Sequence, residues 1–215
     1  MSLSRLPLPL LDGHIMLYKG RSAAEIPRDS SLLDSEGMVN MTALASSSQC
    51  DFNQVETAWY FSREEETGQV YRSFAAVRVL GAQPWILKIQ VPQTFLDSTQ
   101  RAELWYGRDW KEFVWRSRKG EIPSDPMPAK FDEYAKPGIA KIVEGHVCIK
   151  APTVVSRTKK GDVQFEMEEG HCLVIQTSSG ERKATQFVII DRRVARDLGR
   201  LIRGKIHIDV YPPNS

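Results

Sequence analysis

A lysine beside a glycine and a helix end rich in arginine are the parts of this sequence best suited to holding an anion. Lys19 precedes Gly20 in "LYKG", and a glycine beside a cation permits close approach of a ligand backbone or a phosphate. Arg116 and Arg118 lie in "DWKEFVWRSRKG" and would make a cleft attractive to anions if they line one. The structural alternative is a solvated charge at a strand end and cations at a helix end.

The aromatic run "WYF" leads into a charged segment that begins with Ser62. Neighbouring residues of a strand point to opposite faces, so we expect Phe61 in the core and Tyr60 facing a cleft. Ser62 and Glu65 have the spacing of a capping box, which predicts a helix over residues 63–77. A buried Tyr71 hydroxyl needs a hydrogen-bond partner, which a cleft would offer. The expected buried stripe of this helix consists of Val70, Tyr71, Phe74 and Val77.

A second capping-box pattern pairs Asp109 with Glu112 and predicts a helix that ends in basic residues at Gly120. In that position Glu112 satisfies a helix terminus. A structural role therefore competes with any role of this carboxylate in chemistry.

The remaining chain is typical of short strands joined by turns. We expect a helical connection at 97–107, irregular chain at 121–137, and strands at 14–20, 86–91, 144–150, 163–167, 171–176, 185–190 and 205–212. A long loop poor in bulky residues, 29–53, is a candidate lid or specificity loop. Residues 192–203 form a basic amphipathic helix, whose arginines either face solvent or contact nucleic acid. These patterns predict a single α+β domain over residues 1–215.

Composition excludes several classes. The chain of 215 residues can bury a substantial core, and its net charge of +2 does not by itself indicate nucleic-acid binding. The three cysteines lack CxxC spacing and the four histidines are scattered, so we expect a reduced, cytoplasmic protein without a metal site. No apolar run approaches the roughly 18 residues that span a bilayer, and prolines interrupt the leucine-rich N-terminus. We therefore expect no membrane association and no signal peptide.

Three separated motifs in a fixed order carry a resemblance. "LYKG", "WYFSREEETGQVYRSFA" and "DWKEFVWRSRKG" resemble a group of small fungal proteins, which in turn looks like a distant branch of the ADP-ribosyltransferase fold. The resemblance covers residues 15–120, whereas the strand-rich part with the basic helix, 140–212, carries no such motif. It implies twisted, mostly antiparallel sheets around a cleft, with short peripheral helices.

The resemblance also implies roles for residues. In that fold the first motif holds the ribose or pyrophosphate, the second surrounds the nicotinamide, and a late glutamate supports an oxocarbenium-like transition state. Two departures stand out: position 19 is lysine where NAD-using members have histidine or arginine, and Glu112 belongs to a helix rather than a strand edge. Carried over, cofactor binding falls to Lys19, Gly20, Ser62 and Arg116, and catalysis to Glu112, Tyr60 and Tyr71.

Three functions remain open. The first is NAD-dependent ADP-ribosyl transfer or NAD glycohydrolysis, with NAD as substrate and no metal. The second is aminoacyl-tRNA-dependent transfer, as in fungal arginine-containing cyclodipeptide synthases, with Lys19, Arg116, Arg118 and the helix at 192–203 contacting tRNA phosphates. The third is a binding module without a poised acid or base. The first two expect a nucleotide or RNA-like anionic substrate, and the oligomeric state stays open.

Overall fold

The α+β architecture expected from the sequence is confirmed. The computed structural model describes residues 9–26, 31–46, 49–54, 56–78, 81–120, 122–136 and 138–212. A three-stranded antiparallel sheet has the order β1 (His14–Ser22), β3 (Pro84–Pro92) and β9 (Ile206–Val210). A four-stranded sheet has the order β2 (Trp59–Phe61), β8 (Thr185–Ile189), β5 (Ile142–His146) and β4 (Arg101–Leu104). Strands β6 (Val174–Thr177) and β7 (Gly180–Lys183) form a hairpin.

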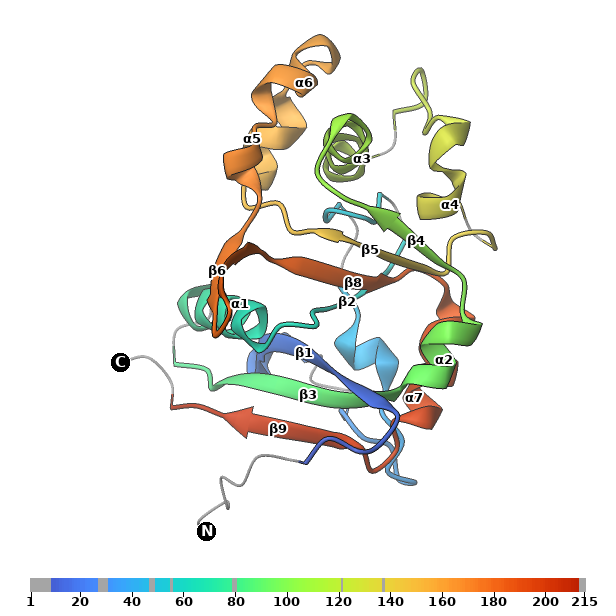
Figure 1. The fold of residues 1–215 in the computed structure, drawn as a ribbon, viewed down its shortest axis with the longest axis vertical. Coiled ribbons are helices and arrows are strands. Elements are labelled where there is room, and N and C mark those ends of the chain that lie inside the picture. Colours follow the sequence, from blue (N-terminus) through green and yellow to red (C-terminus); the bar gives the residue numbers. More distant parts are fainter. Residues whose placement is uncertain are drawn as a thin grey trace.

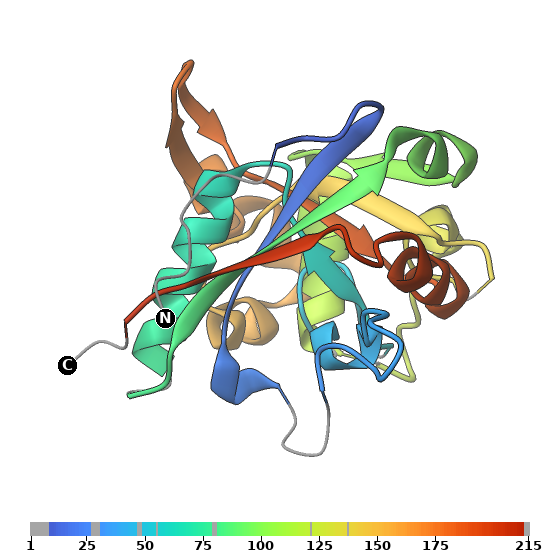
Figure 2. The same cartoon turned by 90° about the horizontal axis from the view of Figure 1, so that it is seen from below.

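Helices lie on the outer face of the four-stranded sheet and at both ends of the two sheets. Figure 1 shows α3 (Arg108–Lys119), α4 (Asp132–Ala135), α5 (Pro152–Arg157) and α6 (Val163–Glu166) on one side of the four-stranded sheet, with the three-stranded sheet on the other. Helix α1 (Glu65–Arg78) flanks one end of the sheets. Helices α2 (Gln93–Ser98) and α7 (Arg192–Leu201) lie at the opposite end, as the turned view in Figure 2 also shows for α7.

Alternating residues of the four-stranded sheet supply two cores. Ile142, Phe187 and Ile189 face the three-stranded sheet and α7, whereas Val143 and Val188 face α3. The same alternation puts Phe61 in the first core and turns Tyr60 toward the second. The expected core position of Phe61 is therefore confirmed, whereas Tyr60 packs against the second core and does not line the cleft described below.

Helix α1 forms where the sequence predicts a helix, but a different face is buried. Phe74 and Val77 are 49% and 70% exposed, so the expected apolar stripe is wrong at these two positions, whereas Val70 and Tyr71 are partly buried against a small cluster. The buried residues are small: Thr67, Gly68, Ala75 and Ala76. The reason lies in the strand beneath, because a Cβ at Gly20 would overlap the carbonyl oxygen of Gly68. Helix and strand backbones touch there, which leaves room only for small side chains.

Two further segments differ from the expectation. Residues 163–167 contain α6 instead of a strand, and Lys111 Nζ of α3 donates to the Gln164 carbonyl at 2.7 Å. Residues 97–107 contain β4 instead of a helix, because this segment pairs in parallel with β5 and buries Ala102 and Leu104 in alternation. Within 122–136, expected to be irregular, lies the short helix α4. The interpretation of the N-terminus concerns in part residues 1–8, which lie outside the described residues.

The contact of α1 with β1 gives the first testable expectation. Gly20→Ala would force the two backbones apart, since the added methyl group meets main-chain atoms that cannot rotate away. We expect a loss of at least about 2 kcal/mol in the free energy of unfolding, measured by urea titration. Gly161→Ala is the matched control, because a Cβ there meets no atom within 4 Å. Equal stability of both variants would contradict the close contact.

Candidate functional site

A buried ion pair lies at the centre of the region that the sequence motifs approach. Nε of Arg118 in α3 donates to Asp51 Oδ1 at 2.8 Å, and Nη2 lies 2.5 Å from the same oxygen. The other carboxylate oxygen accepts from the Cys148 amide at 2.8 Å and from Gln186 Nε2 at 2.9 Å. Arg118 also donates to the carbonyl oxygens of Cys148 and Lys150. Both charged groups have their hydrogen-bond partners inside the protein, so the pair connects α3 to residues far from it in sequence and has a structural role.

Lys19 lies inside the protein, not at a solvated strand end. The residue is only 8% exposed, and its Nζ donates a hydrogen bond to the Tyr60 carbonyl at 2.9 Å. The ammonium also lies 5.5 Å from the centre of the Phe61 ring. Burial lowers the pKa of Lys19 to about 7, with a further lowering by Arg21. The amine is thus partly uncharged at neutral pH.

The two candidate tyrosines lie near Lys19 and the ion pair. Tyr60 Oη donates to Asn53 Oδ1 at 2.6 Å and accepts from the Phe52 amide at 2.9 Å. Tyr71 packs against a small cluster made of Val147, Leu173, Ile175 and Ala184. Burial raises the pKa of both phenols, and the negative charge of Asp51 adds to this. The structure therefore brings Lys19, Tyr60 and Tyr71 into one region, where the Lys19 ammonium and the Tyr60 hydroxyl are hydrogen-bonded to the protein itself.

Glu112 and Arg116 do not join that region. Arg116 and Arg118 are about 200° apart around α3 and face opposite ways. Arg116 pairs with Glu112 at 3.0 Å and with Asp125 at 3.2 Å, and Glu112 also binds Lys130 at 2.8 Å. Burial raises the pKa of Glu112, but the hydrogen bonds from Lys130 and Arg116 outweigh it and leave that pKa lowered. Glu112 is thus an ion-paired carboxylate on the far side of α3.

The capping box expected between Asp109 and Glu112 does not form. Helix α3 begins at Arg108 after Gly107, without a side-chain cap. Asp109 instead pairs with Lys130 at 2.7 Å, like Glu112. The helix and its end at Gly120 are confirmed, with φ of 84° at that glycine. The pattern therefore predicted the helix correctly and its terminal hydrogen bonds wrongly.

Gly20 and Ser62 have structural partners. The close approach that Gly20 permits is made by α1. Ser62 Oγ donates to Glu64 Oε2 at 2.6 Å and accepts from the Glu64 amide at 3.1 Å, so the expected capping box with Glu65 does not form. Glu65 binds Lys88 at 2.9 Å instead. Gly20 and Ser62 therefore shape the junction of β1, β2 and α1.

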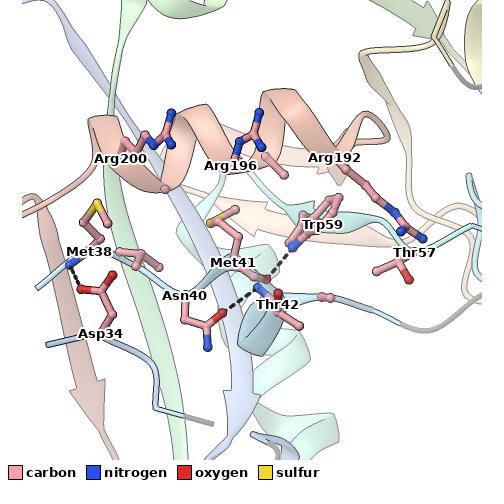
Figure 3. A pocket seen from close by; sticks show the side chains of 14 residues that line it. Asp34, Met38, Asn40, Met41, Thr42, Thr57, Trp59, Arg192, Arg196 and Arg200 are labelled. Atoms are coloured by element: carbon pink, nitrogen blue, oxygen red, sulfur yellow. Dashed lines mark hydrogen bonds between the residues drawn. The ribbon is translucent and has the colours of Figure 1, made fainter. Parts of the chain in front are cut away.

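An open cleft of about 540 Å³ lies elsewhere, between α7 and the segment 34–45. Helix α7 lines it with Arg192, Arg196 and Arg200, which Figure 3 shows following one another along the helix. Successive arginines are four residues apart, which corresponds to about 6 Å along the helix axis. The other wall and the base are mainly apolar: Met38, Val39, Met41, Ala45 and Trp59.

The electrostatics of the cleft favour an anion. Three arginines line the cleft, and Asp34 is the one carboxylate among the described residues that line it. Asp34 accepts hydrogen bonds from the amides of Glu36 and Met38, so this carboxylate stabilises the turn that it belongs to. Arg192 pairs with Glu56 at 3.1 Å, and both side chains are exposed. Arg196 has no ion-pair partner within the part of the chain that the structure describes. Arg200 lies 3.6 Å from Asp197 of the same helix, and both of these side chains are exposed as well. Exposed ion pairs contribute little stability, so Arg192 and Arg200 can exchange their carboxylate partners for a ligand.

The wall opposite α7 is held in place by β2. Trp59 Nε1 donates to the Met41 carbonyl at 2.5 Å, and the Ser46 amide donates to the Ala58 carbonyl at 2.8 Å. A Cβ built on Gly199 of α7 would lie 2.8 Å from Met41 Cγ, so helix and segment meet at the glycine. The cleft is therefore a fixed feature of the packing between α7, β2 and this segment.

The sequence indicated both walls of the cleft separately. The loop at 29–53 and the basic helix at 192–203 each stand out by composition, but no local pattern shows that they face each other. Asp51 was missed, since a single aspartate in a polar loop carries no signal of burial. Its partner lies 67 positions away.

Comparison with known proteins adds no relative. No protein-family model, curated protein or solved structure matches the chain. None of the helices among the described residues is long and apolar enough to cross a membrane. In the same part of the chain no group of three or more histidine, cysteine, aspartate or glutamate side chains could hold a metal ion. The function must therefore be inferred from the geometry.

The burial of Lys19 makes stability depend on pH. Between pH 7 and 10.5 the unfolded chain keeps a proton on Lys19 that the folded protein releases, so stability rises with pH. From pH 6 to pH 9 we expect the wild type to gain about 1–3 kcal/mol relative to Lys19→Met in urea titrations. Lys159→Met, at an exposed position, serves as control and should follow the wild type. Parallel curves for wild type and Lys19→Met would show that Lys19 stays charged when folded.

Proposed function

We propose that this protein binds a nucleotide or RNA-like anionic ligand in the cleft between α7 and the segment 34–45. The observation that carries the proposal is the row of Arg192, Arg196 and Arg200 along one wall of a cleft whose other wall is mainly apolar. Guanidinium groups pair bidentately with phosphate oxygens, and the apolar wall suits bases or another flat group.

The shape of the cleft favours several phosphates over one. The first and last arginine of the row are eight residues apart, which is about 12 Å along a helix axis. A single phosphate contacts at most part of such a row, whereas the successive phosphates of a single-stranded nucleic acid can contact all of it. Asp191 caps the start of α7 by accepting from the amides of Arg193 and Val194, so the helix terminus does not compete for the ligand.

We further propose an ADP-ribosyltransferase-like scaffold with group-transfer activity. In support, "LYKG" and "WYFS" lie side by side, with Tyr18 and Ser62 exchanging both backbone hydrogen bonds at 2.8 and 2.9 Å. The position of Glu112 leaves the NAD-dependent reaction without its expected acid near Tyr60 and Tyr71. In transfer from an RNA-bound substrate the arginine row would bind the RNA phosphates, and we therefore rank this reaction above NAD-dependent transfer. A binding module without catalysis uses the same cleft.

Binding is measured by fluorescence anisotropy with a labelled 12-nucleotide single-stranded RNA at several salt concentrations. We expect Arg196→Gln/Arg200→Gln to weaken binding at least about tenfold, because the variant cannot form two of the charge-assisted hydrogen bonds to phosphate. The slope of log K against log salt should fall by roughly 0.7 for each phosphate that is no longer neutralised. Unlabelled NAD as competitor tests the nucleotide alternative in the same assay.

Arg193→Gln/Arg203→Gln is the control, since it removes the same charge from exposed positions that do not line the cleft. We expect this variant to bind nearly as tightly as the wild type. Equally weakened binding in both double variants would mean unspecific attraction and would overturn the proposed site. Absence of binding by the wild type would overturn the proposed ligand class.

A further inference from the structure

Two buried cysteines face each other across a pair of extended segments. Cys148 and Cys172 form an antiparallel bridge, flanked by hydrogen bonds from the Ile149 amide to the His171 carbonyl at 2.8 Å and from the Leu173 amide to the Val147 carbonyl at 2.9 Å. Neither cysteine amide donates to the other residue: that of Cys148 binds Asp51 and that of Cys172 binds the Glu169 carbonyl. This pattern defines the non-hydrogen-bonded kind of antiparallel pair.

That kind of pair brings side chains close. Its Cα atoms are about 4.5 Å apart, and the two side chains leave the sheet on the same face. Disulfides occur at Cα separations of about 4.4–6.8 Å. Cys148 and Cys172 also belong to the same hydrophobic core, so both thiols lie within one packed volume. The backbone is thus already arranged for a cross-strand bond, although both cysteines are free thiols here.

We propose that Cys148 and Cys172 are a modification site that hydrogen peroxide oxidises to an intramolecular disulfide, which a dithiol reduces back to the two thiols. The bond closes the excursion at 149–171, which carries α5 and α6. This excursion already binds α3, since Trp115 Nε1 donates to the Thr158 carbonyl at 2.9 Å. Oxidation therefore fixes residues 149–171, with α5 and α6, against the second core. The proposal is independent of the cleft and of its ligand.

The reaction balances with hydrogen peroxide as the oxidant. One thiolate attacks a peroxide oxygen, the O–O bond breaks, and a sulfenic acid and hydroxide form. The second thiol then attacks the sulfenic sulfur, the S–S bond forms and water leaves. Cys148 and Cys172 are only 5% and 1% exposed, so a small oxidant is required.

The same burial makes the reaction slow at neutral pH. Burial raises the pKa of Cys172 to about 11 and that of Cys148 to about 12, so few thiolates are present. The rate should rise close to tenfold for each pH unit between pH 7 and 9, as the thiolate fraction does.

The test uses the reduced full-length protein treated with hydrogen peroxide, then alkylated in denaturant, digested and analysed by mass spectrometry. We expect a peptide pair linked through Cys148 and Cys172, lighter by two hydrogen atoms, that disappears on treatment with dithiothreitol. The melting temperature of the oxidised protein should rise by about 5–10 °C and return on reduction, since the bond closes a loop of intermediate length.

Cys50→Ser is the control and should leave both the cross-link and the temperature shift unchanged. Cys172→Ser should abolish both while keeping the reduced melting behaviour within a few degrees of the wild type. Linkage of either cysteine to Cys50, or overoxidation without any linked pair, would overturn the proposal. If Cys172→Ser fails to fold, the linked peptides of the wild type and of Cys50→Ser decide the matter alone.

Discussion

The structure depends on keeping Asp51 and Arg118 together inside the protein. An isolated buried charge costs several kcal/mol, so once α3 and the turn at 49–53 are both packed, each residue requires the other. The turn is correspondingly tight. The Gln49 amide donates to the Asn53 carbonyl at 2.9 Å, and Gln49 has a φ of 64°, a value found at no other non-glycine position among the described residues. The same carboxylate also binds Cys148, two residues beyond β5, and Gln186 of β8, so it connects the turn to the four-stranded sheet.

This constraint reaches the cleft through the chain on either side of the turn. Upstream, the segment 34–46 is fastened to β2 by the Trp59 indole and by the bridge between Ser46 and Ala58. Downstream, β2 pairs with β8, after which the chain enters α7. The two walls of the cleft are thus attached to the same two strands. A ligand held between them meets a surface that is already arranged, which lowers the entropic cost of binding.

Local patterns were reliable where turn residues mark the ends of a short apolar run or of a helix. Such runs identified β1, β3 and β8, and basic residues before a glycine marked the end of α3. The pattern failed for α1, because a backbone contact at Gly20 selects small residues that carry little hydrophobic signal. It failed for β4 although Ala102 and Leu104 alternate with charged residues, since the strand has only four residues.

The site was partly foreseeable for the same reasons. Lys19 and Tyr60 do come together, because the motif strands are neighbours, but neither of them lines the arginine-lined cleft. Glu112 was assigned to chemistry on resemblance, and only the direction in which α3 faces removes it. Neither the Asp51–Arg118 pair nor the arginine-lined cleft can be derived from spacing along the chain. Both arise from contacts between segments far apart in sequence.

Binding of a single-stranded nucleic acid between the arginine row and the segment opposite it can be measured directly by hydrogen exchange with and without a saturating single-stranded RNA. We expect slower amide exchange confined to residues 34–45 and 192–201, since the ligand bridges these two walls and suppresses their opening. Slower exchange in α3 and in residues 122–136, with 34–45 and 192–201 unchanged, would contradict it and would place the ligand beside Glu112 and Arg116.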